Sequence, residues 1–283
     1  MSAPERLSRR TLLAAPALWF VGCRHQRPSP VATDLPYGPS SSQRLDLYPA
    51  AVQDPGRRAP LAVLIHGGGW EKGSRDDVVH VIANLTSRGY AVANVGYRLA
   101  AEARAPGAAE DVRHAIEYAR SRAKDWNADG GRMLLVGFSA GAHLALLSSL
   151  APSGVLDGPQ SHPRAIVSFW GITDLADLLD GPNAKNFARN WVAGSVRDRG
   201  FVAALSPVTY DAAEAPALCA VHSVHDDVVP YAHSETLVRK FHEAKRPATV
   251  IRRFHQGHAA PSTDYAALFD GIFRFLDHAK VVE

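Results

Sequence analysis

The chain has 283 residues, of which 46% are hydrophobic and 21% are charged, so it can build a buried core and does not have the composition of a disordered protein. Its 22 glycines and 19 prolines are ordinary numbers, and its two cysteines allow at most one disulfide. No internal repeat is visible. These properties exclude collagen-like, solenoid and cystine-stapled architectures. The net charge of +3 comes largely from the first 22 residues, so a basic face for nucleic acid is not indicated.

The N-terminal segment has the order of an export signal: basic residues, then an apolar stretch, then a small residue. The sequence SRRTLL at 8–13 resembles a twin-arginine export motif. The apolar residues 11–22 are too few to cross a bilayer, which needs about 20. Phe-Val-Gly-Cys at 20–23 resembles a lipobox, in which Cys23 would be lipidated and become the mature N-terminus. The alternative is a buried N-terminal helix that stays in the protein.

We therefore expect three parts in the chain. Residues 1–22 are predicted to be the export signal of a bacterial protein, and residues 23–34, rich in proline and serine, a tether. Residues 35–283 are predicted to form one folded domain, periplasmic or anchored to a membrane through the lipid on Cys23. The other cysteine, Cys219, lies in an apolar run and is expected to be a small buried residue.

The predicted domain alternates strands and helices. Short runs of alternating or continuous apolar residues predict strands at 44–48, 61–65, 90–97, 132–138, 165–170, 217–221 and 248–254. Apolar residues at three- and four-residue spacing, or segments between these runs, predict helices at 76–88, 108–126, 140–150, 231–244 and 264–278. This alternation predicts an α/β fold with a mostly parallel sheet covered by helices on both faces. Ligands of such sheets bind at the carboxyl ends of the strands.

A Gly-Phe-Ser-Ala-Gly segment at 137–141 follows one of the apolar runs and opens a predicted helix. It matches the G-x-S-x-G pattern of a nucleophile elbow. In such a sharp turn, side chains at the two glycine positions would collide, and the hydroxyl of Ser139 is exposed above a helix N-terminus. The alternative is that Ser139 only caps the helix.

A second glycine-rich segment, His-Gly-Gly-Gly-Trp at 66–70, follows the first strongly apolar run. Segments of this type supply backbone N–H groups to an oxyanion hole. A phosphate-binding loop is the rival interpretation, but the order Lys-Gly-Ser at 72–74 is not that of a Walker motif. A plain glycine-rich turn is the remaining alternative.

The acid of a serine hydrolase should follow a strand beyond Ser139. Asp226 and Asp227 both follow the run at 217–221, and either could serve. The alternatives are a turn residue, a helix cap, or a metal site in the His-x-x-His-Asp-Asp cluster at 222–227, for which no further ligand is obvious.

The base should follow the last strand. His255 and His258 lie there, and we favour His258 because Gly257 lets the loop bend over the elbow. The other downstream histidines fall on predicted helices and are expected at the surface: His233, His242 and His278.

With these segments in place, the sequence resembles an α/β-hydrolase esterase with an HGGG motif, of the hormone-sensitive-lipase-like and ferulic-acid-esterase-like families. Residues 96–102, GYRLAAE, are similar to the family's N-Y-R-L-A-P-E, with Gly96 and Ala101 as departures. The family's H-G-x-x-D-x-x-V-P signature lies over 222–230, with Ser223 in place of glycine, and puts the acid at Asp226. There is also some resemblance to arylformamidases, which open N-formylkynurenine.

The resemblance implies an α/β-hydrolase fold with a small cap insertion. It further implies a serine carboxylesterase acting on short-chain, aryl or carbohydrate esters through an acyl-enzyme, with Ser139, His258 and Asp226 as the triad. The oxyanion hole would consist of Gly68, Gly69 and the Ala140 N–H. No metal or organic cofactor is implied, and the partner is a small-molecule ester. The alternatives are an arylformamidase or other amidase, an oligopeptidase, and a non-catalytic protein on the same fold.

Two insertions, at 153–163 and 174–200, are expected near the active-site face. Trp170, Phe187 and Trp191 lie in or beside the second one. These aromatic side chains either line a substrate pocket or pack the insertion onto the sheet, and the sequence favours neither.

Overall fold

The computed structural model describes residues 28–281. The predicted export signal at residues 1–22 and the predicted lipidation site, Cys23, lie outside the described residues, as does the side chain of His255. Within residues 28–281, no helix is both long enough and apolar enough to cross a membrane.

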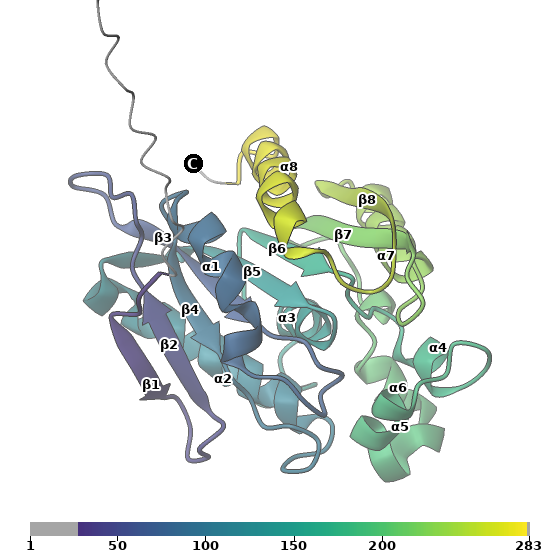
Figure 1. Cartoon of the computed structure of the whole chain (residues 1–283). Coiled ribbons are helices and arrows are strands. Elements are labelled where there is room, and N and C mark those ends of the chain that lie inside the picture. Colours follow the sequence, from purple (N-terminus) through teal and green to yellow (C-terminus); the bar gives the residue numbers. More distant parts are fainter. Residues whose placement is uncertain (1–27, 282–283) are drawn as a thin grey trace, which may run out of the picture.

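The described residues form one eight-stranded sheet in the order β1-β2-β4-β3-β5-β6-β7-β8 (Figure 1). Strand β2 (Arg44–Tyr48) runs antiparallel to its neighbours β1 (Ala32–Pro36) and β4 (Ala91–Val95). The remaining strands are parallel to one another and to β4: β3 (Ala59–Ile65), β5 (Ala128–Phe138), β6 (Ala165–Phe169), β7 (Ala217–His225) and β8 (Ala248–Gln256). All seven predicted strands are present.

Strand β1 was not predicted, and it moves the start of the folded region. The backbone N–H of Val31 donates to the carbonyl of Leu47 at 2.8 Å, and Ala32 pairs with Leu47 across the ladder. The sheet therefore begins at Ala32, inside the segment predicted to be a tether to residue 34. An edge strand needs backbone pairing but little apolar side-chain surface, so this segment carried no apolar pattern.

The parallel strands inside the sheet are buried on both faces over most of their length, which explains their continuous apolar runs, whereas β8 lies at the edge and is partly exposed. In β3, Leu61, Val63 and Ile65 face one hydrophobic cluster, while Ala62 and Leu64 face the other. All five are fully buried. Burying one such leucine, valine or isoleucine stabilises the fold by roughly 1.5–3 kcal/mol.

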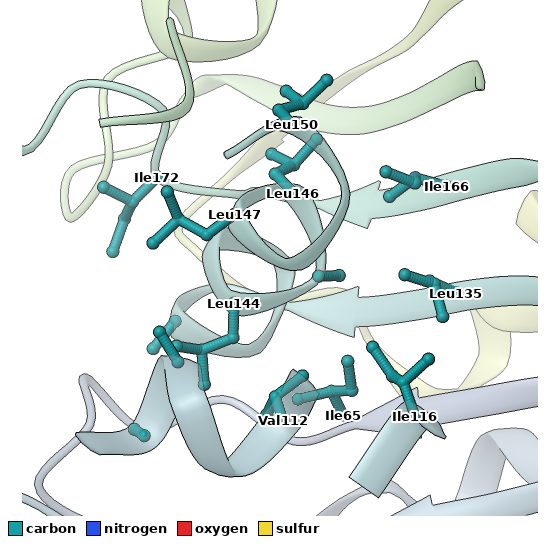
Figure 2. Close-up of a cluster of buried hydrophobic side chains, with 14 of the residues drawn as sticks. Ile65, Val112, Ile116, Leu135, Leu144, Leu146, Leu147, Leu150, Ile166 and Ile172 are labelled. Atoms are coloured by element: carbon teal, nitrogen blue, oxygen red, sulfur yellow. The ribbon is translucent and has the colours of Figure 1, made fainter. Parts of the chain in front are cut away.

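Helices cover both faces of the sheet. The first face packs against α2 (Gly107–Arg122), α3 (Ala140–Leu150) and α7 (Ala232–Glu243), and the second against α1 (Val79–Thr86) and α8 (Tyr265–His278). Figure 2 shows part of the first cluster, where Leu144 of α3 and Val112 of α2 lie beside Ile65 and Leu135 of the sheet. Single 3₁₀ turns flank these helices: η1 (Arg75–Val78), η2 (Ala123–Trp126) and η5 (Ser262–Asp264).

The insertion after β6 forms a cap of short helices, residues 174–209. It contains α4 (Leu175–Leu179), α5 (Asn186–Val192), η3 (Ala193–Arg197), α6 (Arg199–Ala204) and η4 (Pro207–Thr209). Figure 1 shows α4, α5 and α6 grouped together beyond the sheet. Asp174 and Asp198 start α4 and α6 by accepting hydrogen bonds from the N–H groups of Ala176 and Phe201, each at 3.0 Å.

Cys219 lies in β7 and is fully buried, as expected. Burial raises the pKa of its thiol to about 12. The thiol therefore stays protonated at neutral pH and packs as a small apolar side chain.

Candidate active site

Ser139 lies at the sharp turn between β5 and α3, with φ 52° and ψ −116°. A Cβ on Gly137 would lie 2.4 Å from the carbonyl oxygen of Gly141, and a Cβ on Gly141 would lie 2.2 Å from that of His66. Both glycines are therefore required by close backbone contact, as the elbow pattern predicts. The Ser139 side chain makes no capping bond to α3, so the alternative of a simple helix cap is wrong.

His258 joins Ser139 to Asp226. Its Nε2 lies 2.8 Å from the Oγ of Ser139, and its Nδ1 lies 2.8 Å from Oδ2 of Asp226. Asp226 follows β7, and His258 follows β8 after Gly257, whose φ of +94° turns the chain. The structure thus brings together three residues that are far apart in the sequence. Asp227, the other candidate acid, is exposed.

The Asp226 carboxylate is fully buried and surrounded by donors. Its Oδ1 accepts the N–H groups of Val228 and Val229, both at 2.9 Å. Burial by itself raises the pKa of this carboxyl, but hydrogen bonds from His222 and His258 outweigh that effect and hold the pKa well below its usual range. Asp226 is therefore ionised at neutral pH, as a group that stabilises an imidazolium must be.

The oxyanion loop, residues 66–70, lies next to Ser139. Gly68 and Gly69 have φ values of +112° and +63°, which favour glycine. Within residues 28–281, neither of their N–H groups donates to another protein group. Ala140 is the first residue of α3, so its N–H also lacks an acceptor inside the helix. These N–H groups can bind a developing oxyanion.

Tyr97 packs against the oxyanion loop and hydrogen-bonds to it. Its hydroxyl donates to the carbonyl of His66 at 2.9 Å, and its ring stacks on the His66 imidazole with centroids 4.3 Å apart. The Nδ1 of His66 donates in turn to the carbonyl of Gly67 at 2.8 Å. Burial raises the pKa of Tyr97, so its hydroxyl remains a donor. Sequence reasoning noted the GYRLAAE segment but missed this role.

Ser139 and His258 open into a cavity of about 700 Å³, which is the size of ordinary small-molecule sites. One part of its lining is apolar and contains Phe138, Trp170, Phe187, Val228 and Tyr265. The lining also includes exposed polar side chains: Glu71, Lys72, Asp77 and His80. The cavity can therefore take a ligand with an apolar part and a hydroxylated or charged part.

The structure resolves the question about the aromatic residues of the cap. Trp170 and Phe187 line the cavity. Trp191 does not, because it is fully buried and stacks on Trp70 of the oxyanion loop. Both interpretations are thus correct, for different residues.

The prediction that His233 lies at the surface is wrong. It is 4% exposed, its Nδ1 accepts the backbone N–H of Thr173 at 3.0 Å, and its Nε2 lies 3.1 Å from Oδ2 of Asp177. The first turn of α7 packs against the cap. The apolar periodicity of α7 does not indicate this contact, so the burial of His233 could not be predicted from it. Among the described side chains of residues 28–281, which exclude that of His255, no three from His, Cys, Asp or Glu are grouped to hold a metal ion.

Known proteins that are similar to this chain include esterases. Residues 45–241 match the BD-FAE family model. Esterase LipQ of Mycobacterium tuberculosis is 29% identical over 240 residues, which are 79% of this chain and 55% of LipQ. The probable carboxylic ester hydrolase LipM of the same organism is 25% identical over 228 residues, 77% of this chain and 53% of LipM. The chain spans about half the length of the curated relatives it matches.

Solved structures show the same fold. A truncated carbohydrate esterase from gut microbiota has a TM-score of 0.75 and 24% identity, covering 88% of this chain and 97% of its own. The apo form of Thermogutta terrifontis esterase 2 has a TM-score of 0.74 and 20% identity, covering 91% and 97%. These similarities confirm the predicted α/β-hydrolase fold. Because the matched family model covers most of the folded region, the chain belongs to the BD-FAE family, in agreement with its resemblance to ferulic-acid-esterase-like proteins.

Proposed function

We propose that this chain is a serine carboxylesterase in which Ser139, His258 and Asp226 form the catalytic triad. The observation that carries the proposal is the position of the His258 ring, whose two nitrogens each lie 2.8 Å from a partner, Ser139 Oγ on one side and Asp226 Oδ2 on the other. A serine hydroxyl is a weak nucleophile until a base removes its proton, and this arrangement supplies the base and its orienting acid.

The mechanism follows from these contacts. His258 Nε2 takes the proton of Ser139 Oγ as the oxygen attacks the ester carbonyl, and Asp226 stabilises the imidazolium that forms. The backbone N–H groups of Gly68, Gly69 and Ala140 hold the negative charge of the tetrahedral intermediate. The loss of one such donor typically costs about 3 kcal/mol of transition-state stabilisation. His258 then protonates the leaving alcohol, and water hydrolyses the acyl-enzyme.

The substrate we propose is a small ester with an apolar or acetyl acyl group and a hydroxylated alcohol, such as an acylated sugar. The cavity supports this because its lining combines the apolar side chains of Phe138, Trp170 and Tyr265 with exposed polar ones. The polar side chains include Glu71 and His80. Among the structures of the same fold, one is described as a carbohydrate esterase and another as an acetyl ester-xyloside bifunctional hydrolase.

The test is a p-nitrophenyl ester series from acetate to decanoate, assayed with the wild type and with Ser139→Ala. We expect turnover of the short-chain esters, and its loss in a folded Ser139→Ala protein. Wild-type rates in that variant would overturn the proposal. A folded wild type that hydrolyses no ester but opens N-formylkynurenine would instead establish the arylformamidase alternative.

We propose further that the protein is exported by a bacterium and anchored by a lipid on Cys23. The twin-arginine-like SRRTLL segment and the lipobox-like residues before Cys23 support this. The measurement is fractionation of cells expressing the full chain or Cys23→Ala. We expect the wild type in the membrane fraction and the variant in the soluble periplasmic fraction. Equal distribution of the two proteins would refute the anchor.

A further inference from the structure

The imidazole of His222 lies beside the Asp226 carboxylate and has no part in the proposed mechanism. His222 is located near the end of β7 and is fully buried. Its Nε2 lies 3.2 Å from Oδ2 of Asp226 and 3.0 Å from the carbonyl oxygen of Val229. Its Nδ1 lies 2.7 Å from the Oγ of Ser234, on α7. One ring therefore links the strand, the loop that carries Asp226, and a helix.

These contacts fix the position of the proton on the ring. The Val229 carbonyl can only accept, so Nε2 of His222 must carry a hydrogen, which is shared between that carbonyl and Asp226. In the neutral ring Nδ1 is then an acceptor, and the Ser234 hydroxyl donates to it. Every polar atom of this buried ring has a partner, which is the condition for a stable buried polar network.

With His222 included, four donor groups lie within 3.2 Å of the Asp226 carboxylate oxygens. Oδ1 accepts the N–H groups of Val228 and Val229, and Oδ2 is shared by His222 and His258. A carboxylate has about four lone-pair sites, so this one is nearly saturated. It can neither rotate freely nor direct its whole charge at His258.

We propose that His222 is a positioning residue that holds the Asp226 carboxylate toward His258 and neutralises part of its charge. The proposal rests on the proposed function, because it concerns the acid of the proposed triad. A chain of hydrogen bonds then runs from Ser234 through His222, Asp226 and His258 to Ser139. His222 touches neither substrate nor the reacting atoms and acts only through Asp226.

This role has a consequence for the pH profile. When the His222 donor is lost, Oδ2 of Asp226 keeps more of its negative charge and attracts the Nδ1 proton of His258 more strongly. The imidazolium form of His258 is then favoured over the neutral ring. Since the base must be neutral to act, the acid limb of kcat/KM moves to higher pH. A residue that only fills space would lower the rate without moving this limb.

Other ionisable groups lie near this chain of hydrogen bonds. The ring of Tyr231, on the loop before α7, meets the His222 ring edge-on at 5.8 Å, and its hydroxyl accepts from Arg252 of β8. His233, next to Ser234 on α7, faces the cap. None of these three contacts the Asp226 carboxylate, and the substitutions below leave them in place.

Two amide variants separate positioning from packing. The amide nitrogen of glutamine can reach the place of Nε2, so His222→Gln restores the donor to Asp226. Asparagine is one methylene shorter, so His222→Asn can keep a contact to Ser234 but does not reach Asp226. The measurement is the pH dependence of kcat/KM on p-nitrophenyl butyrate, with melting temperatures and circular dichroism as checks of folding.

We expect His222→Asn to lose about ten- to hundredfold in kcat/KM, with its acid limb shifted upward, and His222→Gln to recover most of both. A folded His222→Asn variant whose acid limb is unmoved overturns the proposal. A His222→Gln variant that loses as much kcat/KM as His222→Asn, with the same shift of the acid limb, also overturns it. If His222→Asn does not fold, Ser234→Ala tests the same series of hydrogen bonds, because it removes the donor to Nδ1 of His222. The acid limb then moves upward by a smaller amount, and an unmoved limb overturns the proposal. Undiminished turnover in Ser139→Ala would refute the proposed function itself, whatever the His222 variants show.

Discussion

The indole of Trp191, in the cap, stacks on the indole of Trp70, in the oxyanion loop, with ring centroids 4.3 Å apart and the planes inclined by 9°. Both side chains are fully buried. The ring of His143, on α3, meets both indoles edge-on at 5.0 and 5.4 Å. The cap, the oxyanion loop and the helix that begins at the elbow therefore share one aromatic cluster, which keeps Trp70 at its unusual φ of 61°.

Removal of Trp191 should affect both stability and catalysis. Trp191→Ala leaves a cavity under the oxyanion loop, and a buried tryptophan replaced by alanine typically costs about 3–5 kcal/mol. We expect kcat to fall more than KM rises, because the N–H groups of Gly68 and Gly69 act mainly in the transition state. Urea unfolding and steady-state kinetics on p-nitrophenyl butyrate measure the two effects.

A matched control for this variant is Trp126→Ala. Trp126 is only partly buried, in η2, and packs against Tyr118 rather than the oxyanion loop. This substitution should lower stability by less and leave kcat unchanged. If Trp191→Ala kept the wild-type kcat, the link between cap and oxyanion loop would have no catalytic importance.

Substitution of the two adjacent aspartates, Asp226 and Asp227, should have very different effects on kcat. Asp226→Asn keeps the shape of the side chain but removes the charge that stabilises the His258 imidazolium, and kcat should fall by about 10⁴-fold, as in other triads. Asp227→Asn alters an exposed residue whose carbonyl, not its carboxylate, accepts from Lys185 at 3.0 Å, and it should retain full activity. Steady-state kinetics decide the matter, and equal losses in the two variants would contradict the assignment.

The parallel strands inside the sheet were predictable because they are buried on both faces and read as continuous apolar runs. Strand β1 was not, since it lies at the edge and is held by backbone pairing to β2. Helices α4, α5 and α6 have only five to seven residues, too few for a 3.6-residue period to show. Their positions depend on contacts with the sheet and the oxyanion loop that no local pattern encodes.

The candidate site also contains residues that the sequence alone identifies and residues that it does not. Ser139 and the glycines of the oxyanion loop stand in motifs whose spacing reflects local backbone sterics, so the sequence alone identifies them. Asp226 and Asp227 are adjacent acids in one turn, and residue type alone does not separate them. The resemblance to the H-G-x-x-D-x-x-V-P signature favoured Asp226, and the path of the loop places the carboxylate of Asp226 beside His258. The burial of His233 depends likewise on the cap, which lies more than 20 residues away in the sequence.

Gly68 should not tolerate even alanine. Its φ is +112°, and a Cβ there would lie 2.0 Å from the backbone carbonyl of Lys72, which cannot move as a flexible side chain would. Gly68→Ala should therefore displace the oxyanion loop, lower the melting temperature and abolish most of the turnover. Gly181→Ala is the control: its φ is +74° and nothing lies within 4 Å of a Cβ. That substitution should cost about 1 kcal/mol of stability from backbone strain alone and leave kcat unchanged. Similar losses of turnover in the two variants would show that strain, rather than contact with the Lys72 carbonyl, sets the effect.

His143 should make the fold sensitive to acid. It is fully buried, its Nε2 donates to the carbonyl of Leu205 at 2.7 Å, and burial lowers its pKa to about 4. In the unfolded chain this histidine has a pKa near 6.5, so between pH 6.5 and pH 4 the unfolded state binds more protons than the folded state. The free energy of unfolding should therefore be constant above about pH 6.5 and fall as the pH decreases toward 4, by on the order of 3 kcal/mol from this group.

The measurement is urea unfolding of the wild type and His143→Gln from pH 7 to pH 4. Glutamine can place its amide nitrogen near the position of Nε2 and does not titrate. Burial also lowers the pKa values of His66 and His233, so both proteins should lose stability in acid, but the slope of the variant should be smaller. Parallel slopes would contradict this prediction, because they would mean that His143 gains its proton as readily in the folded protein as in the unfolded chain.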